Sequence, residues 1–221
     1  MEKYYGVIAE RVNETDWLGE EIILPRAPKG TNSFIKNGSI QYAQTEVSPV
    51  SCTIHGAMGA YSALTGYKFT LDERKTLWSE ALARGVNPKV GWYINDAVDL
   101  VRNYVNDNLK VKVCSYRINL GSFEHGVAMR LGYSVITGYR GNALWKADRD
   151  DNGIINNTKF VDTTYGHCLH SNYSIGDEYD RVVDSYPARK TNLFSIPTAN
   201  WKQLVLNKVF FSTGYIYIVK P

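Results

Sequence analysis

Apolar residues in the first half of the chain recur every three or four positions, which is the spacing of helices that bury one face. The first run starts near Cys52, with Ser51 at the N-cap position. Its apolar members are Ile54, Ala57, Met58, Tyr61 and Leu64. A second helix is predicted after the capping box formed by Thr70 and Glu73, and it ends at Gly85.

A third helix is predicted from an apolar stripe that starts at Ile94, and a short fourth helix from 122 to 131. After Gly132 the pattern changes to β-branched and aromatic residues separated by Gly, Asp and Asn, which is typical of strands. The predicted strands cover 133–139, 154–161, 167–173, 180–186 and 209–219, with a brief helix around 201–206. Helices first and strands second predict an α+β fold with two segregated layers.

The length of 221 residues suits one domain, over residues 1–221, whose two lobes share an interface. We expect a lead-in over residues 1–43, a helical lobe over about 44–131 and a β lobe over about 132–221. Lys and Arg are scattered and the net charge is only +3, so no nucleic-acid partner is expected. No signal peptide and no run of about 20 apolar residues is present, so no membrane partner is expected.

The chain has three cysteines, Cys52, Cys114 and Cys168, with no CxxC pair and no cluster with zinc spacing. Widely spaced single cysteines fit a reducing compartment better than a disulfide framework. Cys52 begins a predicted helix, where the helix dipole and unpaired N–H groups favour the nucleophilic thiolate. The alternative is a small buried apolar residue, which is the commoner role of a single cysteine.

Four histidines are candidates for a catalytic base. His55 lies three residues after Cys52 on the same predicted helix, which favours a solvent-facing or packing role. His125 falls in the first turn of the fourth helix and is predicted to be structural. His167 and His170 flank the start of a strand on opposite faces, so only one of them can face a cleft shared with Cys52.

Asp184 is the candidate group for orienting the imidazole of His167. It lies near the end of the next predicted strand, and two neighbouring antiparallel strands would bring these positions side by side. The alternative is an Asp in a turn at the end of a strand, which is common. A nucleophile, a base and an orienting carboxylate together are the groups of a thiol hydrolase.

Four short segments resemble motifs of the papain family of cysteine peptidases in their order and spacing. They are 51–57 (SCTIHGA), 166–168 (GHC), 184–186 (DSY) and 214–218 (GYIYI). The segments are similar to that family's nucleophile helix, histidine strand, Asn-Ser-Trp motif and closing strand. Thr53, Asp184 and Tyr186 stand where the family usually has Trp, Asn and Trp. The chain therefore resembles a divergent member of the family, of a bacterial or phage type.

The resemblance implies a papain-like two-lobed fold, with an N-terminal helical lobe and a C-terminal antiparallel β-sheet or barrel lobe. It also implies a triad of Cys52, His167 and Asp184 that cleaves peptide or amide bonds through a thioester, without a cofactor or metal. The family places a Gln before the nucleophile in the oxyanion hole. The usual register falls on Glu46, whose charge would repel an oxyanion, so we expect Gln44 to serve instead.

By the same resemblance, Gly91 is the candidate substrate-binding residue, because it lies where the family has a Gly-Gly turn. Trp92 beside it is expected to be a core residue. The expected partner is a peptide or protein substrate, and the expected location is cytoplasmic or virion-associated. Two alternatives stay open: a transglutaminase-like or peptidoglycan amidase-like thiol enzyme, and an inactive papain-fold module that binds a partner.

A calcium site is a further alternative. Asp148, Asp150 and Asn152 precede Gly153 with the spacing of the first half of a calcium loop. Lys159 stands where a bidentate Glu would be needed, and a hairpin turn explains the same residues without a metal.

Overall fold

The structure is a computed structural model, and it describes residues 6–7, 42–140, 166–174, 179–183, 185 and 193–219. The helices in these ranges are α1 (Cys52–Thr65), α2 (Leu71–Ala83), α3 (Ile94–Asn108), α4 (Phe123–Arg130) and α5 (Trp201–Leu206). The strands are β1 (Gly6–Val7), β2 (Gly91–Trp92), β3 (Val113–Asn119), β4 (Val135–Arg140), β5 (Gly166–Ser174), β6 (Tyr179–Val183), β7 (Leu193–Pro197) and β8 (Phe210–Val219). Two short 3₁₀ turns are η2 (Gln44–Glu46) and η3 (Thr198–Asn200).

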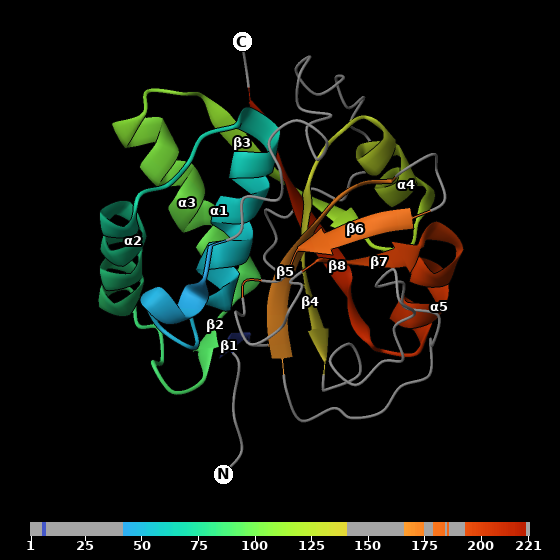
Figure 1. Cartoon of the computed structure of the whole chain (residues 1–221), viewed down its shortest axis with the longest axis horizontal. Helices are drawn as coiled ribbons and strands as arrows, with labels where there is room; N and C mark the ends of the chain where they lie inside the picture. The colour runs from blue at the N-terminus through green and yellow to red at the C-terminus, as the bar shows by residue number, and fades with distance from the viewer. Residues whose placement is uncertain are drawn as a thin grey trace.

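Six of the strands form one antiparallel sheet in the order β3-β8-β4-β5-β6-β7. Figure 1 shows α1, α2 and α3 in the left half of the molecule and β6, β7 and α5 in the right half, with β4, β5 and β8 between them. The predicted α+β class is therefore confirmed. Among the helices of the described ranges, none has both the length and the apolar composition needed to cross a bilayer.

The predicted order of helices first and strands second is wrong at β3. This strand precedes α4 and pairs with β8 along seven residues, from Val113 opposite Val219 to Asn119 opposite Thr213. Strand β7 was also not predicted, whereas the predicted strands 133–139, 167–173 and 209–219 are confirmed as β4, β5 and β8. The predicted strand 154–161 lies outside the described residues.

Helix α1 packs between α3 and the strands of the sheet, chiefly β5. Twelve of its fourteen residues are buried, which is expected of a helix with neighbours on all sides. Its glycines allow a close approach to β5: a methyl group at Gly59 would lie 2.2 Å from Cε1 of His170, and one at Gly56 would lie 2.9 Å from Sγ of Cys168. A larger residue at either position would force the facing side chain or the helix itself to move.

The capping box predicted for α2 is confirmed. Thr70 Oγ1 accepts a hydrogen bond from the N–H of Glu73, and the Glu73 carboxylate accepts one from the N–H of Thr70. The two contacts satisfy two backbone donors at the start of the helix. They fix where α2 begins, and therefore the position of Arg74, which contacts Glu46 in the segment before α1.

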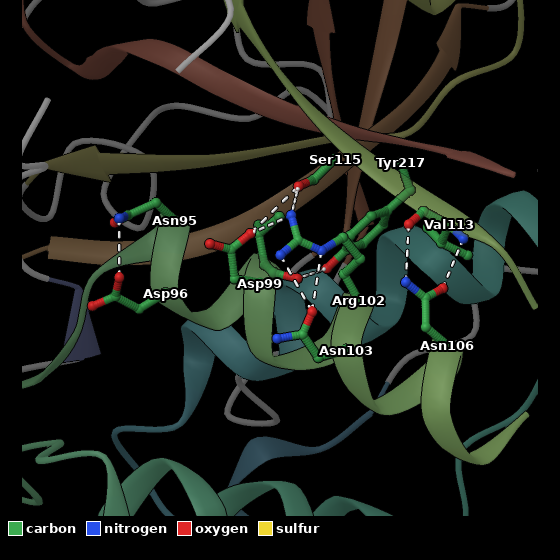
Figure 2. A network of polar contacts seen from close by, with 10 residues as sticks. Asn95, Asp96, Asp99, Arg102, Asn103, Asn106, Val113, Ser115 and Tyr217 are labelled. Atoms are coloured by element: carbon green, nitrogen blue, oxygen red, sulfur yellow. Dashed lines mark hydrogen bonds and ion pairs between the residues drawn. The ribbon is translucent and has the colours of Figure 1, made fainter. Parts of the chain in front are cut away.

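Polar contacts join α3 to the edge strand β3 (Figure 2). Arg102 lies 2.8 Å from the Asp99 carboxylate and donates a hydrogen bond to the hydroxyl of Ser115. One turn later, the side chain of Asn106 both accepts from the N–H and donates to the carbonyl of Val113. These contacts satisfy the backbone N–H and carbonyl of the first residue of β3.

Candidate functional site

Cys52 is the first residue of α1 and has no exposed surface (0%). Its sulfur accepts a hydrogen bond from the backbone N–H of Cys168, at 3.4 Å. The hydroxyl of Ser51, the N-cap residue, donates to the carbonyl of Ser48 and makes no capping hydrogen bond to the first turn. The thiol therefore lies where the start of α1 meets the start of β5.

His167 immediately precedes Cys168, so the N–H that reaches the Cys52 sulfur belongs to the peptide bond between residues 167 and 168. The imidazole of His167 is buried (2% exposed) and packs edge-to-face against Tyr139, its cross-strand partner on β4. His170 contacts α1 at Gly59 instead. The two histidines thus face opposite sides of β5, as predicted: the ring of His170 faces α1, and the ring of His167 lies against Tyr139 of β4.

Gln44 lies in the η2 turn and is fully buried (0% exposed). Its Oε1 accepts a hydrogen bond from the hydroxyl of Ser185 at 2.7 Å, and its backbone N–H donates to the carbonyl of Ser185 at 3.0 Å. Its Nε2 donates to the carbonyl of Pro49. A carbonyl can only accept, so the Pro49 contact fixes which end of the carboxamide is nitrogen.

The Nε2 atom of Gln44 carries two hydrogens, and the Pro49 carbonyl accepts only one of them. The second is therefore the candidate donor to an oxyanion. Glu46 is the position at which the resemblance would place the oxyanion-hole residue. Its carboxylate lies 2.8 Å from Nη2 of Arg74 on α2. The buried residue of this turn is Gln44.

Asp184 lies outside the described residues, and so do Tyr186 and the candidate calcium ligands Asp148, Asp150 and Asn152. Ser185, the next residue after Asp184, is described and is buried against Gln44. Ser185 is thus joined to the turn that carries the candidate oxyanion donor. Within the described ranges, His, Cys, Asp and Glu side chains form no group of three or more that could hold a metal ion.

Gly91 is buried in the short strand β2 and has a positive φ of 105°. Its N–H donates to the carbonyl of Asn87, and it pairs in register with Gly6 of β1. None of these contacts involves Cys52 or Gln44. Trp92 beside it belongs to the main hydrophobic core, as predicted.

His55 is buried, so the expected solvent-facing role is wrong and the packing role is confirmed. Its Nδ1 lies 2.9 Å from the carbonyl of Ser51, which can only accept, so Nδ1 carries the proton. Nε2 is buried with no hydrogen-bond partner among the described residues. Burial lowers the pKa of His55 to about 4, because the protonated, charged ring would lose the solvation it has in water.

His125 is structural, as predicted. Its Nδ1 accepts a hydrogen bond from the N–H of Gly121, and its ring packs edge-to-face against Trp201. Burial lowers its pKa to about 4 as well. Both buried histidines are therefore neutral at pH 7.

Sequence reasoning missed Pro49, Ser185 and Arg74 as parts of this site. Pro49 acts through a backbone carbonyl, which no side-chain pattern reveals, and Ser185 belongs to the 184–186 motif, but its contact with Gln44 was not predicted. Arg74 lies on the predicted second helix, where a single basic residue is ordinary. The contact between Ser51 and His55 could have been predicted from their spacing, since residues four apart lie on the same side of a helix.

The three cysteines are unbridged. No protein-family model matches the chain, and searches of the curated proteins and of the solved structures find no match either.

Proposed function

We propose that this chain is a papain-like thiol hydrolase that cleaves peptide or amide bonds. The observation that carries the proposal is the hydrogen bond from the N–H after His167 to the Cys52 sulfur. A thiol at the start of a helix and a histidine on the facing strand are the two groups that nucleophilic thiol catalysis requires. The two-lobed papain-like arrangement is part of the same proposal.

In this reaction the Cys52 sulfur attacks the substrate carbonyl carbon, and His167 takes the thiol proton and then gives it to the leaving amine. The product of this step is a thioester. Water attacks the thioester with His167 as base, which releases the acid and regenerates the thiol. Asp184 holds the imidazole of His167 in the tautomer that can accept the proton.

The carboxamide of Gln44 and the backbone N–H of Cys52 stabilise the negative charge on the carbonyl oxygen. Two features of Gln44 support this role. Its amide is held at both ends, by Pro49 and by Ser185, so it is oriented before the substrate arrives. Its Nε2 carries a second hydrogen and lies in a buried site, where a hydrogen bond to an anion is stronger than in water.

The burial of Cys52 favours a second candidate, an inactive papain-fold module that binds a partner. A sulfur with no exposed surface cannot meet a carbonyl carbon until its surroundings move. Thr53, which replaces the Trp usual in the family, is a second departure in the first turn of α1. The two candidates differ in whether Cys52 reacts with a substrate-like electrophile.

The test uses the full chain, a set of fluorogenic peptide amides, cell-wall peptide fragments and amine acceptors, and an epoxysuccinyl peptide as irreversible probe. Cys52→Ala should lower kcat by at least about 10⁴-fold. Cys114→Ala is the matched control, because Cys114 is a partly exposed thiol on β3, and it should leave turnover unchanged. Mass spectrometry should find the probe on Cys52 before Cys114 or Cys168.

A well-folded sample that shows no turnover and no labelled Cys52 would contradict the hydrolase and support the binding module. Turnover that survives in Cys52→Ala would contradict both. Transfer to an amine, or cleavage of cell-wall fragments alone, would keep the thiol mechanism and assign the chain to the transglutaminase-like or amidase-like type.

A further inference from the structure

The η2 turn sends its first and last side chains in different directions. A 3₁₀ helix has about three residues per turn, so residues two positions apart are rotated by about 120°. Gln44 points into the protein, whereas Glu46 is exposed and reaches Arg74 on α2 at 2.8 Å. Because the turn is only three residues long, a rotation of its backbone would change the directions of both side chains.

Arg74 is itself held firmly. Its guanidinium lies over the ring of Tyr42, 5.3 Å from the ring centroid, and the residue is only 7% exposed. The hydroxyl of Tyr42 is within hydrogen-bond distance of Ser62 on α1 and accepts from the N–H of Phe69, both at 2.8 Å. The segment around Gln44 is thus fixed on both sides, by Tyr42 before it and by Glu46 after it.

Arg74 is not fully satisfied by these contacts. Its Nε and Nη1 are buried and have no hydrogen-bond partner among the described residues. Burying a charged guanidinium costs desolvation free energy, and replacing a buried ion pair by apolar residues of similar volume is often neutral or stabilising. The contact with Glu46 therefore has to be explained by geometry rather than by stability alone.

We propose that Arg74 is a positioning residue for the oxyanion hole: through Glu46 and Tyr42 it fixes the rotation of η2, and so the direction of the Gln44 carboxamide. This inference rests on the proposed hydrolase function. Arg74 touches neither the substrate nor the reacting atoms, and it acts through Gln44.

The first test variant is Glu46→Gln, which removes the charge at an exposed position while keeping the shape of the side chain. Glu80→Gln is the matched control, because Glu80 lies on the same helix as Arg74 and forms an ion pair of the same length, 2.8 Å, with Arg84 at the C-cap of that helix. Both variants are made in the wild-type chain and in a Gln44→Ala background. The measurements are kcat and KM on a peptide amide that the wild-type chain cleaves.

Glu46→Gln should lower kcat about 10-fold with KM nearly unchanged, less than the roughly 10²-fold that a full misplacement of a catalytic group causes. In the Gln44→Ala background the same change should have no further effect, since the group that Arg74 positions is gone. Glu80→Gln should leave kcat unchanged in both backgrounds. An equal fall of kcat in both backgrounds, or no fall in either, would overturn the positioning role.

A second measurement does not depend on turnover. The side-chain amide signals of Gln44 in ¹H–¹⁵N NMR spectra are identified by their loss in Gln44→Ala. They should shift and exchange faster with solvent in Glu46→Gln, and remain in place in Glu80→Gln. Unchanged Gln44 signals in Glu46→Gln overturn the inference, whereas absent turnover with shifted signals counts against the proposed function alone.

Discussion

Acidification should destabilise this protein through His55, well above the pH at which carboxylates titrate. The folded state lowers the pKa of His55 from its ordinary value of 6.5 to about 4, chiefly because the ring is buried. Between these two values the unfolded chain binds more protons than the folded one. The free energy of unfolding therefore rises with pH across this window. The contribution of His55 to it is lost as the pH falls from about 6.5 to about 4.

The magnitude follows from the two pKa values. Between about pH 7.5 and about pH 5, a histidine whose pKa falls from 6.5 to about 4 on folding loses about 2 kcal/mol of unfolding free energy. His125 has the same folded pKa and should contribute a similar amount. Because carboxylates have ordinary pKa values near 4, they contribute little in this range.

Urea unfolding followed by tryptophan fluorescence at several pH values between about 5 and 7.5 measures the effect. His55→Gln has no titrating group at this position, so its stability should depend less steeply on pH, by about 2 kcal/mol over the range. His125→Gln is the matched variant and should flatten the curve to a similar degree. Curves for wild type and His55→Gln that run parallel over the whole range would refute the argument.

Two substitutions test the packing that surrounds the site. Gly59→Ala should lower the free energy of unfolding by about 1–2 kcal/mol, because overpacking against His170 costs more than the roughly 1 kcal/mol gained in helix propensity. In a His170→Ala background, denaturant unfolding should show a smaller loss for the same substitution. An equal loss in the two backgrounds would exclude the clash. Asn106→Ala should cost about 2–4 kcal/mol by leaving the N–H and carbonyl of Val113 without partners. Asn108→Ala, which removes one exposed hydrogen bond on the same helix, should cost less than about 1 kcal/mol, and similar losses in the two variants would contradict this reading.

The elements predicted correctly are those whose signals are local. The capping box of Thr70 and Glu73 lies within four residues, and the structure forms both of its hydrogen bonds. The start of α1 at Cys52 follows from helical spacing and a residue suited to the N-cap. Strand β8 is long and rich in β-branched and aromatic residues, so its composition alone distinguishes it.

The parts that were missed depend on contacts between distant residues. Strand β3 is half-exposed at the edge of the sheet, and its partner β8 lies about a hundred residues later in the sequence. His55 is buried because α1 has neighbours on all sides, whereas helical spacing alone predicts a single buried face. The direction of Gln44 depends on Arg74 and Ser185, which come from two other segments.

The position of the candidate thiol follows from packing between two regular elements rather than from a loop. Gly56 and Gly59 lie on the side of α1 that faces β5, where neither position has room for a side chain. This close approach brings the first residue of the helix, Cys52, within hydrogen-bond distance of the N–H of Cys168. Sites held by packed helices and strands keep their geometry better than sites on loops. A substitution at either glycine should therefore disturb the thiol even though the glycines contact neither Gln44 nor a substrate.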